Sequence, residues 1–265
     1  MDQNQLKRLA AEKAVEEIQS GMVVGLGSGS TIQFALERIG EKIKNKELTN
    51  IIGIPSSVNT EREAVRLGIP LTTLNAECGM QNVEFTAKEK NVRKIKDLHS
   101  ALSTQHSAFV IDLAIDGADE ADENLNLIKG GGGALLREKV IAQASKRFII
   151  MLDESKLSKY LGEKFYVPVE VLEYALEVEN NFLRSLGAET TIRKNDDGSN
   201  YKTDENNILI HAKFNAITDP DKLMRELEQR AGIVEHGLFP SKLVEKIICA
   251  GNDGIKEIYN GSVQV

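Results

Sequence analysis

Residues 22–31 read Met22-Val23-Val24-Gly25-Leu26-Gly27-Ser28-Gly29-Ser30-Thr31. The first five residues are mostly apolar, which predicts a short buried strand. A turn of alternating glycine and serine follows, and a helix is expected from about Thr31 to Ile39. A strand, glycine-rich turn and helix in this order leave backbone N–H groups free at a helix N-terminus, where they can bind phosphate. The stretch therefore predicts an α/β fold with an anion site at its first turn.

The turn departs from the fingerprint of a dinucleotide-binding loop. Ser30 stands where the pattern G-x-G-x-x-G needs its third glycine. The next predicted strand, Ile51–Ile54, ends in Pro55-Ser56-Ser57 and offers no acidic residue for a ribose hydroxyl. The hydroxyl groups of Ser28, Ser30 and Thr31 suit a single phosphate group better. The alternative is a tight turn with a serine or threonine helix cap.

Helices and strands alternate along the first half of the chain. We expect an amphipathic helix at residues 4–19, a helix at 59–67, and strands at 71–74, 107–116 and 147–152. This alternation indicates a parallel sheet covered by helices. Ligands of such sheets bind beyond the carboxyl ends of the strands.

From about residue 162 the pattern changes to β-α-β-β-α-β. We expect strands at 165–171, 189–194, 207–214 and 233–238, and helices at 173–186 and 219–231. A last strand at 246–250 is expected to return to the first domain. The sequence thus predicts an α/β protein, with a Rossmann-like parallel sheet domain (1–161 plus 241–265) and a smaller ferredoxin-like α+β domain (162–240).

Three polar stretches are expected near the same edge of the parallel sheet. Asp116-Gly117-Ala118-Asp119-Glu120 follows the apolar strand, and its alternative interpretation is an Asx-type turn. Lys129-Gly130-Gly131-Gly132-Gly133 precedes a predicted helix at 134–145, and four glycines indicate a backbone that comes close to something small. Asp153-Glu154-Ser155-Lys156 ends another strand, where Lys156 is either a site residue or a surface charge.

Glu138 is the candidate general base of this group. Its neighbours at i±3 and i±4 on the predicted helix are all apolar: Ala134, Leu135, Ile141 and Ala142. The side chain should therefore face inward, where desolvation raises its pKa toward the range that suits proton transfer. The alternative is a solvated glutamate on a mostly buried helix.

Composition excludes several classes of function. A net charge of −7 argues against nucleic-acid binding, and no apolar run approaches the roughly 20 residues of a membrane helix. The polar N-terminal residues do not resemble a secretory signal, and Cys78 and Cys249 are expected to be reduced thiols. Neither the cysteines nor the histidines show metal-ligand spacing, so no metal site is expected. The histidines are His99, His106, His211 and His236.

Taken together, these motifs resemble the type A ribose-5-phosphate isomerases. The matching stretches are residues 25–31, 116–120, 129–139 and 153–156 and Gly237-Leu238-Phe239, in the same order and spacing along nearly the whole chain. Residues 75–107 are longer than we expect and carry no family motif. The resemblance implies interconversion of D-ribose 5-phosphate and D-ribulose 5-phosphate through an enediol, without a cofactor, in the pentose phosphate pathway. It also implies a cytoplasmic homodimer or homotetramer.

The resemblance implies a role for each site residue. Glu138 would move the proton between C2 and C1, while Asp116, Asp119 and Lys129 would line the sugar, assist ring opening and stabilise the enediolate oxygen. Lys7 and Lys156 would add cationic contacts, and the phosphate would lie near Ser30 and Thr31. The substrate-binding residues would be Ser28, Gly29, Ser30, Thr31, Asp116, Gly117, Ala118, Asp119, Lys129, Gly130, Gly131, Gly132 and Lys156.

Two other classes of protein share related folds. A sugar-phosphate sensing domain of a transcription regulator would keep the phosphate turn without the catalytic groups. A CoA transferase would use a glutamate as nucleophile. The complete set Asp116, Asp119, Lys129 and Glu138 and the absence of a basic DNA-binding segment favour the isomerase.

Overall fold

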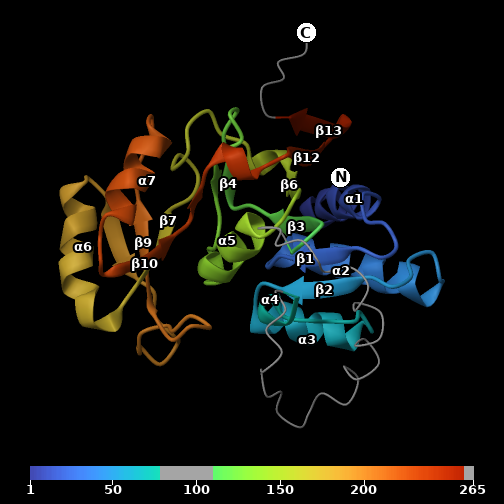
Figure 1. Cartoon of the computed structure of the whole chain (residues 1–265). Helices are drawn as coiled ribbons and strands as arrows, with labels where there is room; N and C mark the ends of the chain where they lie inside the picture. Colours follow the sequence, from blue (N-terminus) through green and yellow to red (C-terminus); the bar gives the residue numbers. More distant parts are fainter. Residues whose placement is uncertain (78–109, 260–265) are drawn as a thin grey trace.

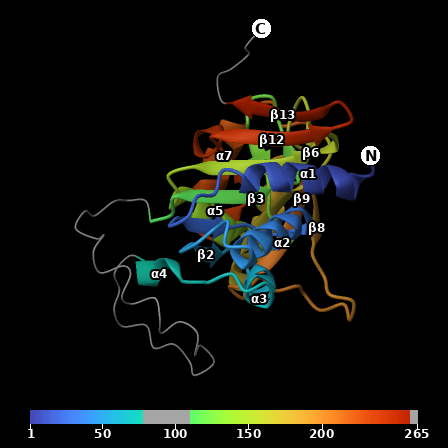
Figure 2. The same cartoon turned by 90° about the vertical axis from the view of Figure 1, so that its right-hand side faces the viewer.

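A six-stranded sheet forms the centre of the computed structural model, which describes residues 1–77 and 110–259. The strand order is β13-β12-β6-β3-β1-β2, and Figure 2 shows the strands stacked in this order. All neighbours are parallel except the β12–β13 pair. The strands are β1 (Val23–Leu26), β2 (Ile52–Pro55), β3 (Leu113–Gly117), β6 (Phe148–Asp153), β12 (Lys246–Gly251) and β13 (Gly254–Tyr259).

Alternate residues of the central strands enter two different cores. On β6, Ile149 and Met151 belong to the core that contains α1 and α2, whereas Ile150 and Leu152 belong to the core on the α5 side. A parallel sheet covered on both faces needs apolar residues at every position, which explains the continuous apolar runs in the sequence. The helices are α1 (Gln3–Val15), α2 (Ser30–Lys44), α3 (Val58–Arg66), α4 (Leu74–Glu77) and α5 (Leu135–Gln143).

A second, four-stranded antiparallel sheet lies on the far side of α5 (Figure 1). Its order is β10-β7-β9-β8, and its apolar face packs under α6 and α7 in a third core. The elements are β7 (Val167–Val171), α6 (Leu176–Ser185), β8 (Glu189–Ile192), β9 (Ile208–Lys213), α7 (Pro220–Glu228) and β10 (Ile233–His236). A third, small sheet contains β4 (Glu120–Ala121), β5 (Leu127–Ile128) and β11 (Leu238–Phe239). β4 and β5 come between β3 and β6 of the central sheet, and β11 comes between β10 of the second sheet and β12 of the central one.

The structure confirms the predicted fold class: a mainly parallel α/β sheet and a separate antiparallel sheet with the β-α-β-β-α-β order of elements. The domain boundaries after residues 161 and 240 stay a prediction. Cys78, His99 and His106 lie outside the described residues, as does most of the segment 75–107. Within the described ranges, no helix has the length and apolar character needed to cross a membrane.

Several predicted elements differ from the observed ones. The strand predicted at 71–74 is wrong: Leu71 makes a single bridge to Gly53, and the chain then turns into α4. The hydroxyl of Thr73 accepts a hydrogen bond from the Ala76 N–H group, so a side-chain cap favours the helical turn. The strand predicted at 233–238 is divided at Gly237 into β10 and β11, which belong to different sheets.

Candidate active site

The glycine-serine turn presents an uncapped helix N-terminus. The N-cap residue of α2 is Gly29, with φ +99° and no side-chain cap, so the predicted alternative of a serine or threonine cap is wrong. Gly27 must be glycine because a Cβ atom there would stand 2.1 Å from the carboxyl group of Asp116. Lys7, on α1, donates a hydrogen bond of 3.0 Å to the Ser30 hydroxyl. The N-terminus of α2 and an adjacent ammonium group together favour an anion.

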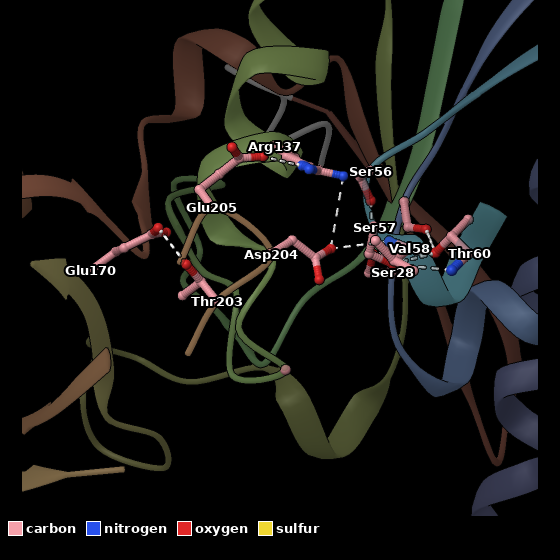
Figure 3. A network of polar contacts seen from close by, with 12 residues as sticks. Ser28, Ser56, Ser57, Val58, Thr60, Arg137, Glu170, Thr203, Asp204 and Glu205 are labelled. Atoms are coloured by element: carbon pink, nitrogen blue, oxygen red, sulfur yellow. Dashed lines mark hydrogen bonds and ion pairs between the residues drawn. The ribbon is translucent and has the colours of Figure 1, made fainter. Parts of the chain in front are cut away.

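The Ser28 hydroxyl belongs to a buried hydroxyl cluster under this turn (Figure 3). Its oxygen lies 2.8 Å from Ser56 Oγ and 2.9 Å from Ser57 Oγ. Thr60 Oγ1 joins the cluster and donates a hydrogen bond of 2.8 Å to the carbonyl oxygen of Gly27. Ser28 thus fixes the turn through its side chain.

Lys129 lies between two buried carboxyl groups. Its Nζ atom is 2.8 Å from Asp116 Oδ2 and 3.2 Å from Glu138 Oε2, and it donates a 2.6 Å hydrogen bond to the Gly117 carbonyl. Glu138 is only 4% exposed, as its apolar helical neighbours predicted. Its Oε2 atom makes no hydrogen bond within the described part of the chain, so its contact with Lys129 is an ion pair alone.

Burial and charge set the protonation states of this cluster. Burial raises the pKa of Glu138 to about 8, and Lys129 opposes that shift. Burial also raises the pKa of Asp116, against the same opposing charge. Burial lowers the pKa of Lys129, but Asp116 and Glu138 raise it more, so the ammonium group stays charged. Glu138 is therefore a carboxyl group poised to exchange a proton near neutral pH.

The four consecutive glycines differ in backbone conformation and in the space around them. Gly130 and Gly133 adopt φ values of +86° and +98°, which side chains rarely tolerate. A Cβ atom on Gly131 would stand 2.8 Å from the ring of Phe165, whereas one on Gly132 would meet nothing within 4 Å. Asp119 accepts a 2.8 Å hydrogen bond from the Gly131 N–H group, so the acidic turn holds the glycine loop. Gly131 thus packs against its neighbours, whereas Gly132 leaves open space at the cleft.

These elements surround one cleft. Every predicted substrate-binding residue except Asp116 lines it, and so do Lys7 and Glu138. Asp116 lies beneath the cleft surface, where its Oδ1 atom accepts hydrogen bonds from the N–H groups of Ser28 and Gly117. Lys156, on the 3-10 turn Glu154–Lys156, lines the cleft, and its role as a site residue stays a prediction. In the described ranges, no three His, Cys, Asp or Glu side chains form a group that could hold a metal.

Sequence reasoning missed a contact between the β8–β9 connection and the helices α3 and α5. Asp204, in the β8–β9 connection, accepts a 3.0 Å hydrogen bond from the Val58 N–H group at the start of α3 (Figure 3). Arg137, next to Glu138 on α5, donates a 2.5 Å hydrogen bond to Glu205. The polar composition of this connection gave no signal of the contact, because such loops are usually solvated.

Known proteins resemble this chain over nearly its whole length. The family model described as ribose 5-phosphate isomerase A (phosphoriboisomerase A) matches residues 83–254. Ribose-5-phosphate isomerase A of Desulfatibacillum aliphaticivorans is 48% identical over 97% of both chains. A probable ribose-5-phosphate isomerase 2 of Arabidopsis thaliana is 38% identical over 97% of this chain and 87% of its own.

Solved structures show the same relationship. Ribose 5-phosphate isomerase from Plasmodium falciparum aligns with a TM-score of 0.81 and 36% identity, covering 98% of this chain and 100% of that one. A D-ribose-5-phosphate isomerase in complex with phospho-erythronic acid aligns with a TM-score of 0.83 and 33% identity, with the same coverage. Identity at this level over the full length, together with the agreement in fold, leads to one conclusion. The chain belongs to the ribose 5-phosphate isomerase A family.

Proposed function

We propose that this protein interconverts D-ribose 5-phosphate and D-ribulose 5-phosphate in the pentose phosphate pathway, with Glu138 as the base. The observation that carries the proposal is the buried ion pair of Lys129 and Glu138 at the edge of a cleft that also contains an uncapped helix N-terminus. An aldose–ketose isomerase needs one carboxylate that moves a proton and one cation that stabilises the oxyanion. Membership of the isomerase family supports the same reaction.

The phosphate group of the substrate would bind at the start of α2. Ser30 and Thr31 lie in the first turn of this helix, and Lys7 and Lys156 line the cleft beside it. The helix dipole and two ammonium groups together offset the phosphate charge. This end of the cleft would anchor the substrate without taking part in the chemistry.

The proton transfer would take place at the opposite end. In the direction from aldose to ketose, the Glu138 carboxylate takes the proton from C2, and the C1 carbonyl oxygen becomes an enediolate oxygen beside the Lys129 ammonium group. A second proton, that of the C2 hydroxyl group, moves to the C1 oxygen. Glu138 then gives the proton that it took from C2 to C1. Asp116 supports the charge on Lys129 from below, and Asp119 would assist ring opening from the cleft wall.

The test is direct. Purified protein is mixed with ribose 5-phosphate in EDTA, without nucleotide, and ketose formation is followed. We expect turnover that added metal does not increase. If ribose 5-phosphate binds, as measured by calorimetry, but no ketose forms, the isomerase proposal fails and the sensing-domain alternative gains support.

The assembly and location follow from the family resemblance alone. We infer a homodimer or homotetramer in the cytoplasm. Light scattering on the eluted protein would decide between these assemblies, and a monomer would contradict the inference.

A further inference from the structure

Two side chains from the second sheet hold the backbone of the glycine loop. Arg193 Nη1 donates a 3.1 Å hydrogen bond to the carbonyl oxygen of Gly131. Tyr201 Oη donates a 3.3 Å hydrogen bond to the carbonyl oxygen of Gly132. Neither side chain lines the cleft. They therefore act on the loop from its outer side.

The position of a carbonyl group fixes the direction of the neighbouring N–H group. In a trans peptide the two point in opposite directions, and no cis peptide bond occurs in the described chain. Because Arg193 holds the Gly131 carbonyl outside the cleft, the Gly132 N–H group of the same peptide points the other way. Gly132 lines the cleft, and a Cβ atom added to it would meet nothing within 4 Å.

The Gly132 N–H group remains available to a ligand. The Gly131 N–H group is bonded to Asp119, and the Gly133 N–H group to the Gly130 carbonyl, each at 2.8 Å. The Gly132 N–H group has no acceptor among residues 1–77 and 110–259. Gly132 is exposed at the cleft, so its N–H group faces water in the free protein and can bind a substrate oxygen instead.

Arg193 is itself firmly placed. Its guanidinium group stacks on the Tyr201 ring, with 3.8 Å between Cζ and the ring centroid. Its backbone N–H group donates to the Leu209 carbonyl at 2.9 Å, and its own carbonyl accepts from the Tyr201 N–H group at 3.0 Å. A fixed cation on the Gly131 carbonyl also polarises the peptide, which makes the Gly132 N–H group a stronger donor.

We propose that Arg193, supported by Tyr201, is a positioning residue that aims the Gly132 N–H group at an oxygen of the sugar, beside Lys129 and Glu138. The inference rests on the proposed function, because the sugar phosphate is the ligand. The second sheet thereby takes part in catalysis without touching the substrate.

The test is Arg193→Met, which keeps a long side chain but removes the donor and the charge. We expect kcat/KM to fall about 10-fold to 100-fold, which is less than the loss of a transition-state donor itself. The affinity for phospho-erythronic acid, measured by calorimetry, should fall in parallel. The affinity for inorganic phosphate should not change, because phosphate binds at α2. Tyr201→Phe, which leaves the ring stack, should have a smaller effect.

Arg230→Met is the matched control. Arg230 also stacks on an aromatic ring, that of Phe182, and it pairs with Glu179 in the same part of the chain, away from the cleft. This variant should lose thermal stability and keep kcat/KM. The proposal would be overturned if Arg193→Met kept the wild-type kcat/KM. It would also be overturned if this variant lost affinity for phospho-erythronic acid and for inorganic phosphate to the same extent. A wild-type protein without isomerase activity would instead refute the proposed function, and the two binding measurements would still test Arg193.

Discussion

Lys129 Nζ lies 3.2 Å from Glu138 Oε2, and both side chains are almost completely buried. Burial alone would keep Glu138 protonated and would favour a neutral lysine. Their mutual attraction opposes both effects, so the lysine stays charged while the carboxyl group can still release its proton. A buried pair of this kind contributes little to stability but places a base and a cation in one site with little water.

Replacing Glu138 by glutamine should abolish most of the activity. The amide keeps the shape of the side chain but cannot accept a proton, so we expect kcat to fall by about 10²-fold to 10⁴-fold with little change in KM. Steady-state kinetics measure both constants. Glu170→Gln is the control, because Glu170 is equally buried but is bonded to Thr203 and Asn207 outside the cleft. If Glu138→Gln retains wild-type kcat, another group is the base.

The activity should increase with pH up to about 8. Burial raises the pKa of Glu138 to about 8 from an ordinary value of 4.5, and only the ionised carboxylate accepts a proton. A profile of kcat/KM against pH should therefore show an acid limb close to 8. An acid limb near 4.5 would mean that Glu138 is solvated in the free enzyme.

The stability of the protein should respond to the same group. Because the pKa of Glu138 is raised on folding, the folded chain binds an extra proton between pH 4.5 and about 8, and the stability that this proton provides is lost as the pH rises through that window. We expect the wild type to lose about 3 kcal/mol relative to Glu138→Gln between pH 5 and pH 8. Urea unfolding of both proteins at the two pH values measures this change. A constant difference would contradict it.

Neighbouring glycines should respond differently to alanine. Gly131→Ala places a methyl group 2.8 Å from the Phe165 ring and 3.0 Å from Asp119, so it should destabilise the protein by about 1 to 3 kcal/mol. Gly132→Ala meets open space and should fold normally, but its methyl group would enter the cleft and raise KM. Urea unfolding and kinetics on both variants make the comparison. Equal destabilisation by the two substitutions would show that the loop differs from the structure described.

Much of the site could be predicted because its signals are local. Four apolar neighbours on a single helix were enough to predict that Glu138 faces inward. The order of strand, turn and helix predicted the turn that lines the cleft at the start of α2. Predictions failed in short segments that could form more than one kind of structure. Residues 71–74 were predicted to be a strand, but they are bridged only at Leu71. Strand β13 was not predicted, because edge strands with exposed residues lack a clear apolar pattern.

By itself, the sequence determined which groups stand at the ends of the parallel strands and which face of α5 is buried, because both follow from the periodicity of neighbouring residues. Only the tertiary structure decided that Lys129 lies between Asp116 and Glu138, that the Ser28 hydroxyl supports the turn, and that Arg193 holds the Gly131 carbonyl. The last of these contacts joins positions 62 residues apart in the chain. Such contacts depend on how sheets and helices pack together, and no local pattern carries that information.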